Sequence, residues 1–186
     1  MSLEPDPPPA EPELLLQTSR FKVVRKQRVD PAGRAYTREV VEHPGAVVLL
    51  PVLDDGRICL IRNYRIAVDA ELIELPAGTL EAGEDPAVCA ARELAEETGY
   101  RARQWHKVMQ FWMSPGILSE RMHLFVARGL TPGERHLQAD EEINTLLATW
   151  DEVLALMADN RIADAKTLAA LLYVERLYPH WLQPAQ

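Results

Sequence analysis

The stretch that decides the fold, residues 78–100, reads GTLEAGEDPAVCAARELAEETGY. Asp85 can cap a helix with its side chain, and Pro86 suits the first helical position. Gly99 suits the left-handed residue that follows a helix. The stretch therefore predicts a helix that begins after Asp85 and ends at Gly99.

The spacing of residues along this helix divides it into two sides. At 100° per residue, the carboxylates of Glu93, Glu96 and Glu97 gather on one side. The opposite side collects apolar residues, which are Ala87, Val88, Ala91, Leu94 and Ala95. We therefore expect the apolar side to be buried and the carboxylates to converge on the other side.

The three carboxylates allow two interpretations. Glu93 and Glu97 are like charges four residues apart, which is mildly destabilising on a helix. One interpretation is a solvated acidic face, with Arg92 and Glu96 as a weak ion pair. The other is a site for a hard divalent cation, which binds clustered carboxylate oxygens and relieves their repulsion. Glu84, just before the helix, is a further candidate for that site.

Outward from this helix, the chain alternates between strand and turn patterns. A hairpin is predicted from Phe21 to Glu42, with its turn at Asp30–Gly33. Further strands are predicted at residues 46–53, 57–62, 71–75, 105–113, 121–127 and 143–150, and further helices at 151–159 and 164–177. The order contains no row of regular βαβ units and no internal repeat. We therefore predict a single α/β or α+β domain.

The composition limits the classes of function. The 186 residues suit one domain, and 28 acidic against 20 basic residues give a net charge of −8. An acidic chain is a poor candidate for binding nucleic acid or an anionic membrane, so we expect neither as a partner. Cys59 and Cys89 are too few for a disulfide framework or a zinc site, which predicts a reduced chain in the cytoplasm. Acids and prolines fill residues 1–15, which predicts a disordered tail and no signal peptide.

The polar positions of the central stretch follow a known pattern. The sequence resembles the Nudix box at each of its fixed positions, which are Gly78, Glu84, Arg92, Glu93, Leu94, Glu96, Glu97 and Gly99. Tyr100 departs from the pattern, because the family usually has an aliphatic residue there. The resemblance implies an α/β/α sandwich with a mixed sheet over residues 43–186, preceded by an N-terminal antiparallel sheet. It also implies hydrolysis of a nucleoside diphosphate linked to a second moiety.

The same resemblance implies a metal site and its ligands. Glu93 and Glu97 are the implied ligands of Mg²⁺, with Mn²⁺ as a substitute, and Glu96 ligates or supports them. The backbone carbonyl of Ala77, directly before the box, often completes such a site. The resemblance also implies that Arg92 and Glu96 are catalytic residues.

Residues outside the box narrow the substrate. Pro115 lies sixteen residues after Gly99, a position typical of ADP-ribose pyrophosphatases within the superfamily. Other segments are similar to the same group, namely residues 43–46, 63–65 with Asn63 in place of the usual glutamine, 74–78, 119–121 and 164–167. We therefore predict hydrolysis of ADP-ribose to AMP and ribose 5-phosphate. The alternatives are a nucleoside diphosphate sugar, NADH or a diadenosine polyphosphate as substrate, or a nucleotide sensor without hydrolysis.

Four residues outside the box are predicted to contact the substrate: Arg65, Glu74, Pro115 and Glu120. Arg65 can give a pyrophosphate a bidentate contact. Glu74 can accept hydrogen bonds from the base or the ribose, and Glu120 is predicted to contact the metal or to orient Arg92. The alternatives are a surface arginine, a solvated strand glutamate and an ordinary Pro-Gly turn.

A loop and the N-terminus carry two further predictions. Water that attacks a pyrophosphate needs a proton acceptor that is not fully used as a metal ligand. The acidic run at residues 139–143 resembles a loop that supplies a catalytic glutamate in several ADP-ribose pyrophosphatases. Glu141 is the preferred general base and Glu142 the second choice, while a solvated acidic turn is the alternative.

The group also often forms a homodimer through exchanged N-terminal strands, a role that we expect for residues 16–42.

Overall fold

The protein is described by a computed structural model that covers residues 11–137 and 142–184. The apolar run after Gly45 forms the centre of a four-stranded sheet, ordered β7 (Ala77–Thr79), β4 (Ala46–Pro51), β9 (Arg121–Pro132) and β8 (Tyr100–Trp112). β4 is parallel to β9 and antiparallel to β7, so the sheet is mixed. Every residue of β4 is buried, which explains why this run is apolar throughout.

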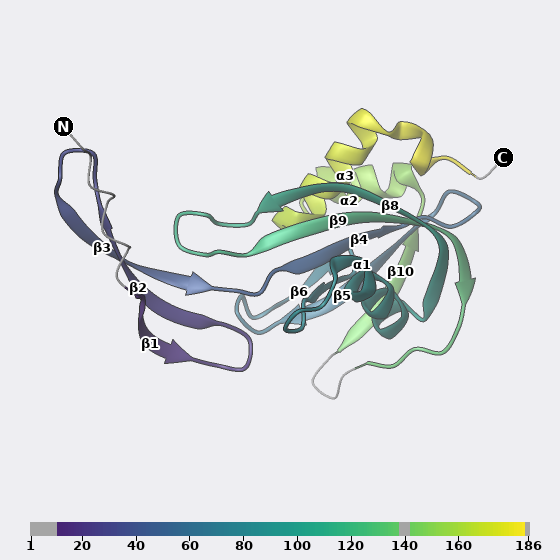
Figure 1. Ribbon diagram of the computed structural model, residues 1–186. Coiled ribbons are helices and arrows are strands. Elements are labelled where there is room, and N and C mark those ends of the chain that lie inside the picture. Colours follow the sequence, from purple (N-terminus) through teal and green to yellow (C-terminus); the bar gives the residue numbers. More distant parts are fainter. Residues whose placement is uncertain (1–10, 138–141, 185–186) are drawn as a thin grey trace, which may run out of the picture.

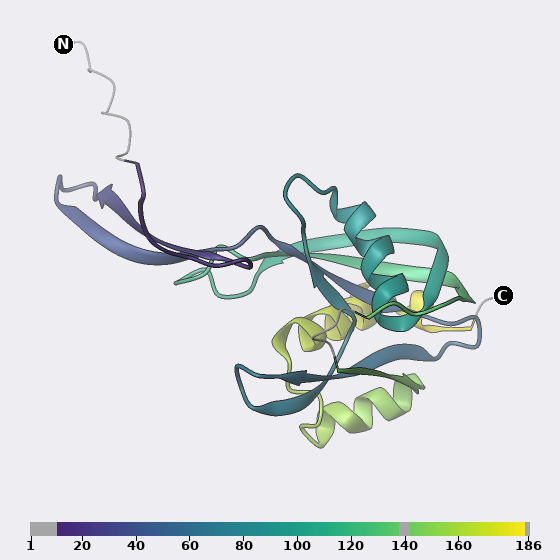
Figure 2. The same ribbon diagram turned by 90° about the horizontal axis from the view of Figure 1, so that it is seen from below.

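A second sheet and the helices cover the two faces of this first sheet. The second sheet is antiparallel and has the order β10 (Ile143–Ala148), β5 (Ile58–Arg65) and β6 (Ala70–Glu74). Its apolar side chains share one core cluster with β4, β9, α2 (Trp150–Ala158) and α3 (Ala165–Leu177). α1 (Pro86–Glu93) packs on the opposite face of the first sheet (Figures 1 and 2). The predicted α/β architecture with a mixed sheet is confirmed.

The helix ends follow from their capping residues. The Asp85 side chain accepts a hydrogen bond from the Ala87 backbone N–H at 2.8 Å, and Gly99 has φ 75°, as predicted. The last turn differs, because it is a π-helix, η1 (Leu94–Thr98). Thr149 caps α2, so Trp150 belongs to that helix and not to the preceding strand as predicted. A short 3-10 helix, η2 (Pro179–Leu182), follows α3.

Two strands are longer than the sequence predicted, and two short ones were missed, β7 and the first strand of the chain. β8 begins at Tyr100 and β9 ends at Pro132, several residues beyond the predicted bounds. Both extensions contain exposed charged or polar residues, because β8 is an edge strand and its pairing needs no apolar pattern. β7 has only three residues and contains Gly78, so it gave no strand pattern.

The N-terminal residues form a separate antiparallel sheet that extends away from the rest of the molecule (Figure 1). Its strands are β1 (Glu13–Gln17), β2 (Lys22–Val29) and β3 (Ala35–Glu42). β2 and β3 confirm the predicted hairpin. The predicted disordered tail was wrong at its end, because Glu13–Gln17 pairs with β2 through apolar residues such as Leu14 opposite Val24. Residues 1–10 lie outside the described chain. None of the described helices is long and apolar enough to cross a membrane.

Candidate active site

The helix of the central stretch turns its carboxylates inward. Glu93 is 4% exposed and Glu97 is 2% exposed, whereas Val88, predicted to be buried, is 61% exposed. The predicted orientation was therefore wrong. The buried side consists of Cys89, Ala90 and Leu94 together with the two glutamates, and it packs against β4 and β9. Small side chains let the helix approach the sheet closely, and the carboxylates meet backbone of the neighbouring strand.

Both buried carboxylates lie against the short strand β7. A Cβ atom at Gly78 would lie only 1.8 Å from Cδ of Glu93, so the Glu93 side chain occupies the space that any other residue at position 78 would fill. The Ala77 backbone N–H donates to Oε2 of Glu97 at 2.9 Å. The structure thus brings together three residues that the sequence predicted for a metal site, Ala77, Glu93 and Glu97.

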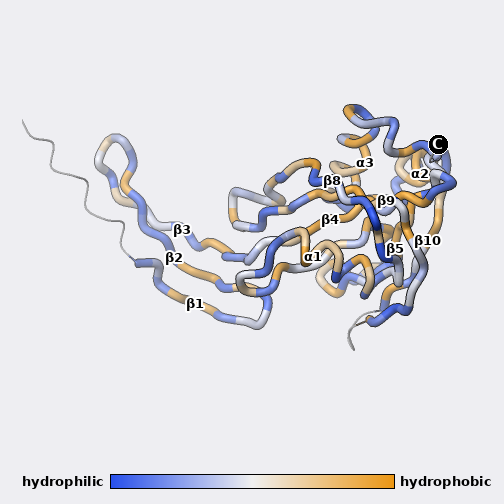
Figure 3. The backbone as a smooth tube through the Cα atoms, turned by 45° about the vertical axis from the view of Figure 1, so that its right-hand side comes forward, coloured by the Kyte–Doolittle hydropathy of each residue, from blue (hydrophilic) through white to orange (hydrophobic). Residues whose placement is uncertain are grey.

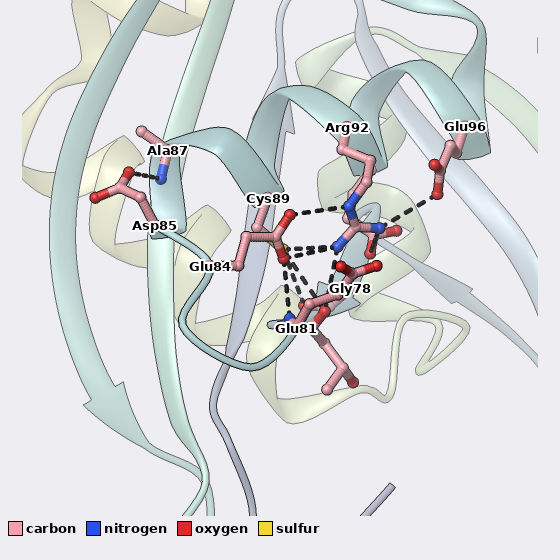
Figure 4. Close-up of polar contacts among 10 residues, drawn as sticks. Gly78, Glu81, Glu84, Asp85, Ala87, Cys89, Arg92 and Glu96 are labelled. Carbon is pink, nitrogen blue, oxygen red and sulfur yellow. Dashed lines mark hydrogen bonds and ion pairs between the residues drawn. The ribbon is translucent and has the colours of Figure 1, made fainter. Parts of the chain in front are cut away.

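Arg92 holds the carboxylates of the loop and the helix in place (Figure 4). Its Nε and Nη2 donate to the two oxygens of Glu84, each at 3.0 Å. Its Nη1 donates to Glu93 at 2.6 Å and to Glu96 at 3.3 Å. The hydrogen bonds from Arg92 lower the pKa of Glu84 to about 2, so this carboxylate is ionised at neutral pH. Glu84 is therefore committed to Arg92, and the structure gives no support to its candidacy as a metal ligand.

Cys89 lies beneath this cluster without taking part in its chemistry. Its Sγ accepts from Nη2 of Arg92 at 3.4 Å and lies 3.7 Å from the carbonyl oxygen of Thr79. Burial raises the pKa of the Cys89 thiol to about 12. A neutral thiol is a poor nucleophile, so Cys89 fills the space between helix and strand.

A cavity of about 1210 Å³ opens beside the two carboxylates. Ala77, Arg92, Glu93 and Glu97 line one wall, which we call the acidic wall. Arg65 lines the cavity as well, as do Glu142 and the turn between β1 and β2, residues 17–22. Acidic and basic groups facing one cavity suit a substrate that carries phosphates, with a cation bridging to the acids.

Arg65 and Glu74 form an ion pair behind this cavity. Nε and Nη2 of Arg65 donate to the two oxygens of Glu74 at 2.9 and 2.6 Å. Glu74 is 1% exposed and also accepts from Lys166 at 2.5 Å, so it does not line the cavity. The predicted contact between Glu74 and a base or ribose is not available in this arrangement. The sequence gave no individual role to Lys166, which was noted only within residues 164–167, a segment similar to that of ADP-ribose pyrophosphatases.

The remaining predicted residues are scattered. Pro115 is exposed in the turn between β8 and β9 and does not line the cavity. Glu120 lies 3.7 Å from Nδ1 of His43, a residue that does line it. Glu142 lines the cavity, while Glu141 lies outside the described residues. The turn at residues 17–22 reaches the cavity of its own chain, which the sequence did not predict.

The residues of the acidic wall suit a hard cation. Within residues 11–137 and 142–184, no three His, Cys, Asp or Glu side chains form a complete metal cluster. Mg²⁺ does not need one, because it is commonly bound by one or two carboxylates, with water and substrate phosphates completing its octahedron. Glu93 and Glu97 offer two buried carboxylates at the backbone of Ala77 and Gly78, which supplies that minimal donor set.

Known proteins are similar to this chain in sequence and in fold. The model of the NUDIX domain matches residues 42–171. The chain is 41% identical over 147 residues to the ADP-ribose pyrophosphatase of Bacillus subtilis (strain 168), covering 78% of this chain and 80% of that protein. It is 40% identical over 159 residues to the methanol dehydrogenase activator of Bacillus methanolicus, covering 83% and 86%. A crystal structure of an ADP compounds hydrolase has the same fold, with a TM-score of 0.80 over 97% of both chains at 24% identity.

Proposed function

The chain belongs to the Nudix family, and from that premise we propose that it hydrolyses the pyrophosphate bond of ADP-ribose with the help of a divalent cation. Water is consumed, and AMP and ribose 5-phosphate are released. The observation that carries this proposal is a single cavity that is lined both by two buried carboxylates at Ala77–Gly78 and by Arg65. The similarity to an ADP-ribose pyrophosphatase over most of both chains supports the choice of substrate.

We propose Mg²⁺ as the cation, with Mn²⁺ as a substitute, held by Glu93, Glu97 and the Ala77 carbonyl, with Glu96 beside them. When bound, the cation supplies positive charge to the phosphoryl oxygens and activates water. Side chains of the protein position the carboxylates and orient the substrate. Arg92 keeps Glu93 and Glu96 in position through its hydrogen bonds at 2.6 and 3.3 Å. Arg65 orients the pyrophosphate from the other side of the cavity, because a guanidinium can contact two phosphate oxygens at once.

The general base is proposed on the loop before β10. Glu141 remains the first choice and Glu142 the second, as the resemblance implies. Glu142 lines the cavity, which supports a role for this segment at the substrate. A carboxylate on this loop that is not used as a metal ligand can accept the proton of the attacking water.

A substrate panel with Mg²⁺ or Mn²⁺ tests the proposal. ADP-ribose, GDP-mannose, NADH and diadenosine tetraphosphate are incubated with the protein, and the phosphate-containing products are separated and identified. We expect the highest kcat/KM for ADP-ribose. Fast turnover of another compound with ADP-ribose inert would overturn the assignment of the substrate. Absence of turnover on the whole panel would overturn the hydrolase itself and favour a nucleotide sensor.

We also propose a homodimer in which residues 16–42 form the interface. The N-terminal sheet extends from the body (Figure 3). It exposes apolar side chains, because Leu14, Leu16 and Val29 are each more than half exposed. Such a surface commonly marks a protein interface. The variant Leu16→Ser/Val29→Ser should sediment as a monomer at micromolar concentration while wild type sediments as a dimer. A monomeric wild type would end this proposal.

Two free, buried cysteines support a reducing compartment, for which we propose the cytoplasm.

A further inference from the structure

A series of charged side chains connects the start of α3 to Arg65, which lines the cavity. Lys166, in the first turn of α3, donates to Oε2 of Glu74 at 2.5 Å, and its Nζ forms an ion pair with Oδ2 of Asp164 at 2.9 Å. Glu74 in turn holds Arg65 by two hydrogen bonds. Positive and negative groups therefore alternate along four side chains, from Arg65 in the cavity wall to the cap of α3. Lys166 itself does not line the cavity.

The start of α3 is fixed to the strand that precedes the acidic wall. Thr167 is fully buried, and its hydroxyl donates to Asp164 at 2.6 Å. The same hydroxyl accepts from the Leu75 backbone N–H at 2.9 Å. Leu75 directly follows Glu74, so this contact fixes the distance between Lys166 and the Glu74 carboxylate. Lys166 is 12% exposed on its side chain and has little freedom to move.

We infer that Lys166 is a positioning residue for Arg65, acting through Glu74; this rests on the proposed function of Arg65 as the pyrophosphate contact. A buried carboxylate needs compensating charge, and here two cations share that task. With Lys166 in place, Glu74 is held in one orientation and Arg65 need not neutralise it alone. Without Lys166, Arg65 becomes the single cation on Glu74, and less of its charge acts on the substrate.

This role predicts an effect on substrate binding more than on the chemical step. Arg65 would contact the pyrophosphate in both the bound substrate and the transition state, and loss of such uniform binding raises KM with little change in kcat. Replacement of a residue that orients a contacting group typically costs about 10–100-fold. We therefore expect Lys166→Met to raise KM for ADP-ribose by about 10-fold and to leave kcat close to the wild-type value.

Matched variants separate positioning from a general loss of stability. Lys166→Arg restores the charge and should recover much of the KM. Leu172→Gln alters the same helix at a side chain that is 50% exposed and should leave both constants unchanged. In a Glu74→Gln background, Lys166→Met should add little, because its partner is already neutral. An equal rise in KM in both backgrounds, or an unchanged KM in folded Lys166→Met, would overturn the inference.

A readout without turnover keeps this test apart from the test of the substrate. The ¹⁵N NMR signal of the Arg65 Nε–H, assigned by its disappearance in Arg65→Lys, reports its hydrogen bond to Glu74 in the ligand-free protein. Lys166→Met should shift or broaden this signal, and Lys166→Gln serves if the methionine variant does not fold. Leu172→Gln should not change it. A signal identical to wild type in both Lys166 variants overturns the inference, even if ADP-ribose proves not to be the substrate.

Discussion

The acidic and basic sides of the cavity are built in different ways. The acidic wall comes from one segment of the chain, in which Glu97 accepts a hydrogen bond from the backbone N–H of Ala77, 20 residues earlier. The basic side is Arg65 of β5, which is held from behind by Glu74 of β6 and Lys166 of α3. Lys166 donates to Glu74 across 92 residues of sequence. In the function proposed above, the acidic wall would place carboxylates where a cation and the reacting phosphorus meet, while Arg65 would orient the rest of the substrate. Changes in the acidic wall should therefore lower kcat, and changes on the basic side should raise KM.

The largest effect is expected from the two buried carboxylates. Glu93→Gln and Glu97→Gln should each lower kcat by about 10³-fold or more, because loss of a preorganised electrostatic group at the reacting centre has effects of that size. Glu96, which contacts Arg92 and is 29% exposed on its side chain, should matter less, by about 10–100-fold. Steady-state rates at saturating Mg²⁺ and ADP-ribose give these values. If all three variants keep wild-type rates, the acidic wall has no catalytic role.

The proposed general base sharpens the same comparison, because it comes from a third segment, the loop before β10. Glu141→Gln should lower kcat by about 10²-fold or more, with KM and the Mg²⁺ requirement nearly unchanged, and Glu142→Gln should be milder. Single-turnover rates of both variants and of the double variant check this. Near-wild-type rates in all three would place the base on the helix, at Glu96 or Glu97.

The structure brings together the residues predicted for the acidic wall, whereas the contacts behind Arg65 were not predicted, for a physical reason. Glu84, Arg92 and Glu93 act within one helix and its preceding loop, so their spacing in the chain determines their spacing in the structure. Arg65 and Lys166 come together because both pair with Glu74, and no local sequence pattern indicates which distant cation will pair with a buried glutamate. Both residues were visible in the sequence, but their partnership depends on tertiary packing.

The orientation of α1 shows where local reasoning failed even within the motif. Amphipathic patterning assumes that apolar side chains are buried and charges are solvated. Here the helix exposes Val88 and buries Glu93, because the space beside Gly78 accepts a carboxylate and the Ala77 N–H donates to Glu97. A functional site thus overrides the rule that predicts the rest of the fold.

Gly78→Ala tests how little displacement the acidic wall tolerates. The new Cβ would lie 1.8 Å from Cδ of Glu93, so the carboxylate or the strand must move. A shift near 1 Å at a reacting centre can cost about 10²-fold in rate, and we expect kcat to fall by that order. Gly116→Ala is the matched control, because no heavy atom lies within 4 Å of its added Cβ. Equal rates for the two variants would show that the wall adapts freely.

The smallest expected effect is the pH-dependent contribution of Glu84 to stability. Hydrogen bonds from Arg92 lower the pKa of Glu84 from its ordinary value of 4.5 to about 2 in the folded protein. A lowered carboxyl pKa stabilises the fold above the unfolded value, and that stability is lost as the pH falls from 4.5 through about 2. Glu84→Gln should therefore lower the free energy of unfolding at pH 7 by about 1.5–3 kcal/mol, the range for a hydrogen bond to a charged group.

Urea unfolding at pH 7, 4.5 and 3.5 measures this difference between wild type and Glu84→Gln. The difference should stay constant from pH 7 to about 5 and narrow below 4.5, while Glu81→Gln, an exposed glutamate in the same loop, should follow wild type throughout. A difference that does not change with pH would mean that Glu84 supports Arg92 through its shape and not through its charge. The acidic wall would then depend on packing at Gly78 more than on the ion pair that holds its arginine.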